Sequence, residues 1–215
     1  MTPDRRPYKR ESEETRREAL ISAALDLVAE GGPQAATVRA IADRAGVTPG
    51  LIRHYFMTKE ELTRAAYLRL MDRMTGDNAA VLEGASQSPT ARLAAFVAAS
   101  LRPPVVDPMR LGVWAGFIHG VQRDPDMRAI HHQSYVAYRD LLQSLIAALP
   151  RTADDARLRA DAIACNAVID GLWLEGSALP EGFADGELER IGLTAVGAII
   201  GIDLTESLPA KGDQP

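Results

Sequence analysis

Cysteine is nearly absent from this sequence of 215 residues. The single thiol, Cys165, allows no intrachain disulfide and no zinc site built from several thiolates. This usage is typical of a reducing compartment. No apolar run approaches the roughly 18 residues of a membrane span, and the N-terminus lacks the apolar stretch of a signal peptide. We therefore expect a cytoplasmic protein without a membrane segment.

Strand signals are also nearly absent, because alternating runs of β-branched residues are missing. Ser, Thr or Asp repeatedly precedes an apolar-periodic stretch, often with Pro just inside it. Thr58 to Glu61 forms a capping-box pattern in which Glu61 can accept from the Thr58 N–H. These signals predict an all-α protein of about nine helices. Eight lie near residues 15–30, 37–45, 49–55, 89–101, 108–121, 125–149, 153–177 and 185–201, and a long fourth helix begins at Thr58 and ends between Gly76 and Gly84.

Charge of one sign does not dominate the whole chain, but it is unevenly spread. The formal net charge is −5, which alone argues against a nucleic-acid partner. Residues 1–71 carry 12 Lys and Arg against 10 Asp and Glu, whereas residues 72–215 carry 12 against 19. The N-terminal third is therefore the better candidate for binding an anion.

Two short predicted helices at 37–45 and 49–55 are the most informative elements. Thr37 and Thr48 stand at their N-caps, and Gly46 supplies the positive φ of the tight turn between them. Their apolar positions, together with three in the first helix, can form one seam. Three helices with a sharp turn between the last two predict a helix-turn-helix unit. The seam residues are Ala23, Leu27, Val28, Val38, Ile41, Ala42, Ala45, Val47, Leu51, Ile52 and Phe56.

The outer face of the third helix suits DNA. Small residues at its tip admit close approach to the major groove, and donors at its edges can hold phosphates. An ordinary packed helix end is the alternative for the tripeptide His54-Tyr55-Phe56 taken alone. The combination of short helices, glycine turn and outward donors favours a DNA-binding role.

The stretch TRREALISAALDLVAEGGPQAATVRAIADRAGVTPGLIRHYFMTKEELTRAAY, residues 15–67, resembles the DNA-binding domain of the TetR family of bacterial transcriptional regulators. HYF and the segment AVIDGLWL at 167–174 most resemble the branch of the choline-responsive repressor BetI. We expect a disordered basic arm over 1–14 and a disordered tail over 206–215, because chain ends are often poorly ordered. The resemblance implies a helix-turn-helix domain over 15–60 and a helical effector and dimerisation domain over 61–205.

The family resemblance also implies which residues contact DNA. Thr48, Pro49, Gly50 and Leu51 would lie nearest base edges, whereas Thr37, Arg39, Arg53, His54, Tyr55 and Lys59 would hold phosphates. Pro49 departs from the polar residues often found there, and it can offer a base only apolar contact. DNA shape or the arm residues Arg5, Arg6, Lys9 and Arg10 would then supply specificity, unless the arm is merely a solvated tail.

Aromatic residues make up only 5% of the chain, yet several fall on predicted helices of the larger region. Trp114 and Phe117 are three apart, as are Tyr135 and Tyr138, so each pair shares a helix face. These four residues, together with Asp170 and Trp173, form a candidate ligand pocket. The carboxylate of Asp170 could allow this pocket to bind a cation. Ordinary core packing is the alternative. Another is an anion site made by His119, Arg123, His131 and His132.

No catalytic motif, cofactor motif or metal-ligand spacing appears. His131 and His132 are adjacent and point in different directions on a helix, and neither has a His at i+4. The last two predicted helices are apolar and rich in small residues, including Gly192, Gly197 and Gly201, which favours a homodimer contact.

We therefore expect a ligand-responsive repressor that binds a palindromic operator in double-stranded DNA as a homodimer and needs no cofactor. Its effector is a small molecule of unknown identity. One alternative is a helical ligand-binding protein whose helix-turn-helix no longer binds DNA. The other is a small helical enzyme using the His and Asp residues near 119–132 and 170.

Overall fold

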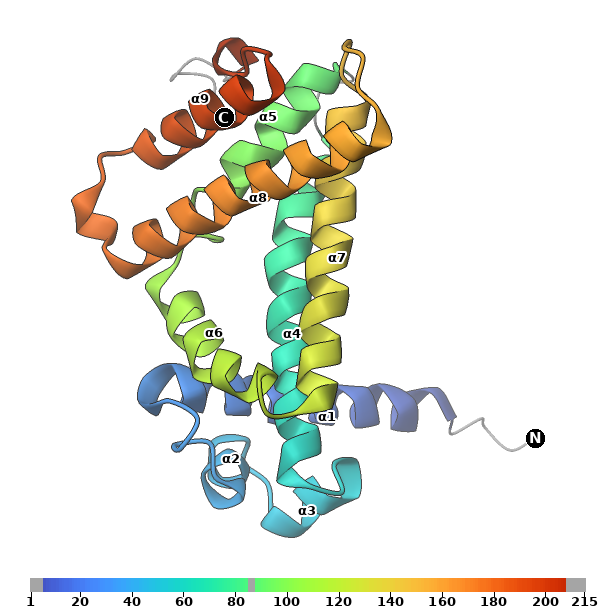
Figure 1. Ribbon diagram of the computed structural model, residues 1–215. Coiled ribbons are helices and arrows are strands. Elements are labelled where there is room, and N and C mark those ends of the chain that lie inside the picture. The colour runs from blue at the N-terminus through green and yellow to red at the C-terminus, as the bar shows by residue number, and fades with distance from the viewer. Residues whose placement is uncertain (1–5, 85–87, 208–215) are drawn as a thin grey trace. The chain divides into compact units, whose positions relative to one another are not determined.

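The computed structural model describes residues 6–84 and 88–207, and every regular element in these ranges is a helix (Figure 1). The expected all-α class is therefore confirmed. The elements are α1 (Arg6–Gly31), α2 (Val38–Arg44), α3 (Pro49–Tyr55), α4 (Lys59–Ala80), α5 (Pro89–Ser100), α6 (Pro108–Val121), α7 (Pro125–Ala147), α8 (Asp155–Ala178), η1 (Pro180–Gly182), α9 (Glu187–Ile200) and η2 (Thr205–Ser207).

Helix α1 departs most from the predicted ranges. It begins at Arg6 rather than near residue 15, so residues 6–14 of the expected disordered arm are helical. Pro7 lies in the first turn, where it is tolerated, and no glycine interrupts the Arg- and Glu-rich stretch before Gly31. Residues 1–5 and 208–215 lie outside the described ranges, so the disorder expected there stays a prediction.

Side-chain caps start several helices where the sequence predicts them. Thr37 Oγ1 accepts from the Ala40 N–H at 3.1 Å. Thr58 Oγ1 accepts from the Glu61 N–H at 3.1 Å, completing one half of the expected capping box. The other half differs, because the Glu61 carboxylate accepts from the Met57 N–H at 2.8 Å and not from Thr58. Helix α3 ends at Tyr55, which leaves the Met57 N–H without a helical acceptor.

The expected N-cap role of Thr48 is only partly correct. It occupies the N-cap position of α3 with an extended backbone, but its side chain accepts no cap hydrogen bond. The Leu51 N–H bonds to the Thr48 carbonyl at 3.0 Å instead. The Thr48 hydroxyl is therefore not occupied in starting the helix.

The chain forms two compact units. Unit 1 comprises the chain up to Met71 and the segment Gly112–His131; unit 2 comprises Asp72–Leu111 and the chain from His132 onward. The functional boundary near residue 60 expected from the sequence stays a prediction; by packing, unit 1 extends to Met71 and includes the segment 112–131. That segment joins unit 1 through packing between residues far apart in sequence, which no local pattern reports.

The core of unit 1 contains the predicted helix-turn-helix seam. Ala23, Leu27 and Val28 of α1, Ile41 and Ala42 of α2, and Ile52 and Phe56 around α3 are all buried, whereas Val38, Ala45, Val47 and Leu51 are half-buried at its edge. Gly46 has a φ of 66°, as the turn requires. Burying a side chain such as that of Ile52 or Phe56 contributes about 2 kcal/mol, which fixes α3 against the unit and leaves its other face outward.

In unit 2, α5 packs against α8 and α9, which also pack against each other. Gly192 of α9 lies so close to Leu101 that a Cβ would collide with its side chain, and a Cβ at Gly176 of α8 would collide with Leu188. The small residues of these helices therefore serve packing within the subunit. Gly197 is also buried, and Gly201 ends α9 with a φ of 74°. Packing within the subunit therefore accounts for Gly192 and Gly197, and the homodimer contact expected of these helices stays a prediction.

Two buried polar features complete unit 2. Cys165 is fully buried, and burial raises the pKa of its thiol to about 12, so it behaves as a small apolar residue. Asp161 is also buried, and it accepts from Arg151 Nη2 at 2.6 Å and from Arg157 Nε at 2.7 Å.

Candidate nucleic-acid interface and ligand site

The tip of α3 projects small, exposed residues. Thr48, Pro49 and Gly50 are exposed, whereas Leu51 is half-buried and Ile52 anchors the helix from below. A Cβ at Gly50 would meet only Thr48 Oγ1, at 3.9 Å. Packing within the subunit therefore does not require glycine there, and the open space above it lets another surface approach the backbone.

Hydrogen-bond donors surround this tip. Arg39 of α2, Arg53 and His54 of α3, and Lys59 at the start of α4 are exposed. Tyr55 is half-buried and meets the His54 ring edge-on, with ring centroids 5.2 Å apart. Thr37 is exposed as well, and its hydroxyl can still donate after accepting from Ala40.

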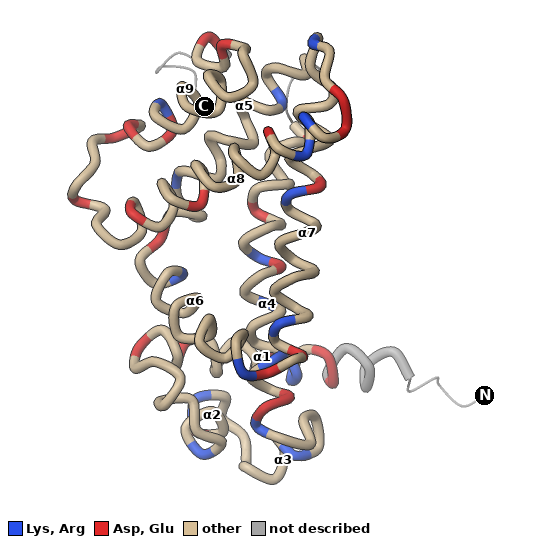
Figure 2. Tube along the Cα trace, viewed as in Figure 1, with Lys and Arg blue, Asp and Glu red and all other residues tan. Residues whose placement is uncertain are grey.

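The local charge favours an anion, in contrast to the net charge of the whole chain. Residues 37–59 contain four Lys or Arg and one Asp, and Figure 2 shows such positions on α2 and α3. One of the four, Arg44, is already paired with Glu30 of α1 through two hydrogen bonds of 2.9 and 2.6 Å. Arg39, Arg53 and Lys59 thus remain for a partner, because none of them forms an ion pair among the described residues.

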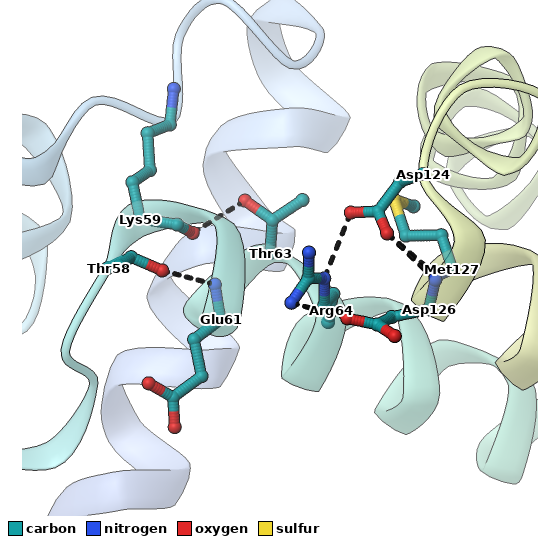
Figure 3. A network of polar contacts seen from close by, with 8 residues as sticks. All are labelled: Thr58, Lys59, Glu61, Thr63, Arg64, Asp124, Asp126 and Met127. Atoms are coloured by element: carbon teal, nitrogen blue, oxygen red, sulfur yellow. Dashed lines mark hydrogen bonds and ion pairs between the residues drawn. The ribbon is translucent and has the colours of Figure 1, made fainter.

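An ion-pair group holds the start of α4 in place. The Arg64 side chain points toward Asp124 and Asp126 at the start of α7 (Figure 3), with Nε 2.9 Å from Asp124 Oδ2 and Nη1 2.7 Å from Asp126 Oδ2. Hydrogen bonding to Arg64 lowers the pKa of the Asp124 carboxyl. Sequence reasoning missed this pairing, since Arg64 and Asp124 lie sixty positions apart.

A buried aromatic group lies farther along α4 in unit 1. Tyr67 is fully buried, contacts Phe117 with ring centroids 5.5 Å apart, and its hydroxyl lies 2.7 Å from His131 Nδ1. Burial raises the pKa of Tyr67 to about 12 and lowers that of His131. Both groups are therefore neutral near pH 7.

The predicted ligand residues divide between the two units. Trp114 and Phe117 belong to unit 1, where Trp114 is half-buried and Phe117 is buried; Tyr135, Tyr138, Asp170 and Trp173 belong to unit 2.

In unit 2, Tyr138, Trp173 and Asp170 already have hydrogen-bond partners within the unit. Tyr138 contacts Phe96 with centroids 5.2 Å apart, and its hydroxyl lies 3.0 Å from Ser100 Oγ. Trp173 is buried and donates its indole N–H to the Val105 carbonyl at 3.0 Å.

Asp170 is exposed at the surface and accepts from Asn166 Nδ2 at 2.8 Å; partial desolvation by the surrounding protein raises the pKa of its carboxyl. The Asn166 Oδ1 atom is buried without a hydrogen-bond partner. Sequence reasoning missed Ser100 and Asn166, although Asn166 stands at i−4 from Asp170, a spacing at which the two side chains meet.

Three other features considered from the sequence are a metal site, a site built from histidines and a membrane-spanning helix. In the ranges 6–84 and 88–207, no group of three or more His, Cys, Asp or Glu is arranged to hold a metal ion. Of the histidines in the alternative anion or enzyme sites, His131 already contacts the Tyr67 hydroxyl at 2.7 Å within unit 1. No helix in the same ranges is long and apolar enough to cross a membrane.

Known proteins share both parts of this architecture. Residues 20–66 match the family of bacterial regulatory proteins named after TetR, and residues 89–201 match the C-terminal region of BetI-type transcriptional repressors. The chain belongs to the TetR family. It is a DNA-binding transcriptional regulator, and its C-terminal region is of the BetI type.

Relatives in this family cover most of the chain. The transcriptional regulator BetI of Rhizobium meliloti is 35% identical over 170 residues, which is 77% of this chain and 79% of the relative. That of Burkholderia thailandensis is 32% identical over 164 residues, 76% of this chain and 83% of the relative. The crystal structure of a putative transcriptional regulator from Pseudomonas aeruginosa PAO1 has 31% identity and a TM-score of 0.80, covering 91% of this chain and 95% of that one. These TetR-family relatives are regulators rather than enzymes.

Proposed function

We propose that this TetR-family regulator is a repressor that binds a palindromic operator as a homodimer and releases it when a small molecule binds. The observation that supports DNA binding is the exposed tip of α3, Thr48 to Gly50. Arg39, Arg53 and Lys59, on α2, α3 and α4, have no ion-pair partner among the described residues. Small residues at the tip permit entry into the major groove, and the surrounding donors hold the phosphates on either side.

The proposed DNA contacts fall into two groups. Thr48, Pro49, Gly50 and Leu51 approach base edges, with Pro49 restricted to apolar contact such as that with a thymine methyl group. The remaining contacts fix the position of the helix on the phosphate backbone and carry little sequence information. They come from Thr37, Arg39, Arg53, His54, Tyr55 and Lys59.

The proposed dimer contact uses α8 and α9. Ile163 and Leu174 of α8 are 38% and 45% exposed although both are apolar. Ala160 and Ala167 of α8 and Ala198 of α9 are exposed too. This apolar surface would be covered if the two helices of one subunit packed against those of another in a four-helix contact. A twofold dimer of this kind matches the twofold symmetry of a palindromic operator.

The proposed effector site lies in unit 2, around Tyr138 and Asp170. An aromatic ring beside a carboxylate suits a small organic cation, and the BetI resemblance implies choline. Trp173 supports this site from its buried position, and Tyr135 contributes an exposed ring. The effector acts by binding more tightly to a conformation whose two α3 tips no longer fit successive major grooves.

Fluorescence anisotropy with a labelled DNA fragment carrying the promoter of its own gene tests the DNA-binding proposal. We expect binding that weakens steeply with salt. Lys59→Ala should weaken it about ten- to thirtyfold at low salt, since each of two phosphate contacts per dimer is worth about 0.7–1 kcal/mol. It should also reduce the slope of log K against log salt by about 2, one per subunit.

Arg102→Ala is the matched control, because it removes an exposed cation of unit 2 that forms no ion pair among the described residues. It should leave both the affinity and the salt slope unchanged. If the protein showed no salt-dependent affinity for any promoter fragment, the alternative of a helix-turn-helix that no longer binds DNA would hold. Equal losses in the two variants would contradict the phosphate role of Lys59.

A further inference from the structure

Unit 1 contains a pocket of about 370 Å³ that none of the roles above uses. It lies between the end of α1, the connection to α2, the start of α4 and the turn from α6 to α7, all within the same unit. Its volume falls in the range of roughly 300–1,000 Å³ that small-molecule sites occupy. Its apolar lining includes Val28, Ile41, Ala66, Phe117 and Met127.

Four charged residues line the same pocket: Lys59, Glu60, Arg123 and Asp124. Figure 3 shows Lys59, Asp124 and Met127 from close by. Asp124 is already compensated, because it pairs with Arg64 and its Oδ1 accepts from the backbone N–H groups of Asp126 and Met127 at 2.9 and 3.3 Å. Its charge is therefore not available to a ligand.

The other three charges are exposed and uncompensated. Neither Lys59 nor Arg123 forms an ion pair within residues 13–84 and 88–206, whose side chains the structure describes. The two cations and two acids of the lining cancel in sum, but Asp124 is held by Arg64, whereas Lys59 and Arg123 are both free to meet an anion. An apolar floor with two unpaired cations at its mouth is complementary to a molecule with an apolar body and an anionic head.

We propose that this pocket binds a small amphipathic carboxylate. Its apolar part packs against Ala66, Phe117 and Met127, and its carboxylate lies at the mouth beside Arg123 and Lys59. The site is separate from the effector site proposed in unit 2, and its binding does not depend on any DNA contact. Because Lys59 is also a proposed phosphate contact, an occupied pocket competes with the operator for that side chain; this last consequence rests on the proposed function.

Octanoate is a suitable probe for the full chain labelled with ¹³C in its methionine methyl groups. Met127 lines the pocket and is 4% exposed, whereas Met57 is 87% exposed and does not line it. Octanoate should shift the Met127 methyl resonance in a saturable manner and leave that of Met57 in place. Met127→Leu identifies the resonance. Octanol and octylamine, which have the same chain length, should bind more weakly than octanoate.

Arg123→Ala should weaken octanoate binding by roughly fivefold at low salt, an effect that shrinks as salt rises. The matched control is Arg73→Ala, which removes an exposed arginine of α4 in unit 2; its octanoate affinity should equal that of the unaltered protein. A Met127 resonance that does not move at millimolar octanoate would overturn the site. Equal affinity for octanoate and octanol, or equal affinity of the two variants, would overturn the carboxylate assignment. None of these readouts involves DNA, so their failure is distinct from a failure of the repressor proposal.

Discussion

Replacing Asp161 by Ala should destabilise the protein far more than replacing its exposed partner Arg157. The Asp161 side chain is 4% exposed and lies between Arg151, which is 16% exposed, and Arg157, which is 60% exposed. Both arginines also donate to carbonyls at the end of α9: Arg151 to Ile200 at 3.4 Å and Arg157 to Ile199 at 3.3 Å. Asp161 therefore holds the two arginines that tie the start of α8 to the end of α9.

The expected loss of folding stability depends on how deeply each ion-pair partner is buried. Removing Asp161 leaves the half-buried Arg151 guanidinium, which is 16% exposed, without its counterion, and this costs about 3–5 kcal/mol. Removing Arg157 breaks a solvent-exposed i,i+4 pair worth about 0.3–0.5 kcal/mol, and Arg151 still compensates the carboxylate. For a chain of this size, a loss of 3–5 kcal/mol lowers Tm by roughly 6–20 °C.

Urea and thermal unfolding at one fixed protein concentration, followed by circular dichroism, measure these differences. Asp161→Asn should lie between the two, because the amide oxygen still accepts one hydrogen bond while the charge is lost; it also provides a measurement if Asp161→Ala does not fold. The reasoning is refuted if Asp161→Ala costs no more than Arg157→Ala. It is equally refuted if Asp161→Asn is as stable as the unaltered protein.

Two further predictions concern the dimer and the pH dependence of folding. Leu174→Glu should raise the dimer dissociation constant by about a hundredfold, since each of two sites loses about 1–2 kcal/mol of apolar burial. Sedimentation velocity should then show monomers. The control Met109→Glu changes a residue of α6 that is 62% exposed, and it should remain dimeric. Folding stability should decline as pH falls below about 6.5, the ordinary pKa of histidine, because burial lowers the pKa of His131 and the unfolded chain then binds a proton that the folded chain does not. Stability measured from pH 8 to 5 should show a smaller decline in His131→Gln, and equal slopes would contradict this account.

Local signals in the sequence predicted the helices well. The boundaries from α2 to α9 lie within a few residues of the expected ones, because Thr37, Ser88 and Asp154 cap helices directly through short-range hydrogen bonds. The turn at Gly46 and the buried faces of Ile41, Ile52 and Phe56 followed from the same local reasoning. The start of α1 did not, because the residues before Thr15 were expected to be disordered as a chain end, although several of them are good helix formers.

The DNA-binding residues on α3 could be proposed from the sequence, since a short helix with one buried face must turn its other face outward. The ligand residues could be proposed only as a set of aromatics. Only the structure showed that Trp173 bonds to Val105 and Tyr138 to Ser100. It also showed that Gly192 and Gly176 serve packing within the subunit rather than between subunits.

The sequence by itself determined the helical class, the helix-turn-helix and its outward donors, because capping, turn conformation and helical periodicity all act over a few residues. Only the tertiary structure decided that residues 112–131 join the first unit, that Arg64 meets Asp124, and that a pocket with a cationic mouth lies between them and α1. These features depend on side chains that lie dozens of positions apart and meet through packing, and no short-range pattern records where such partners come together.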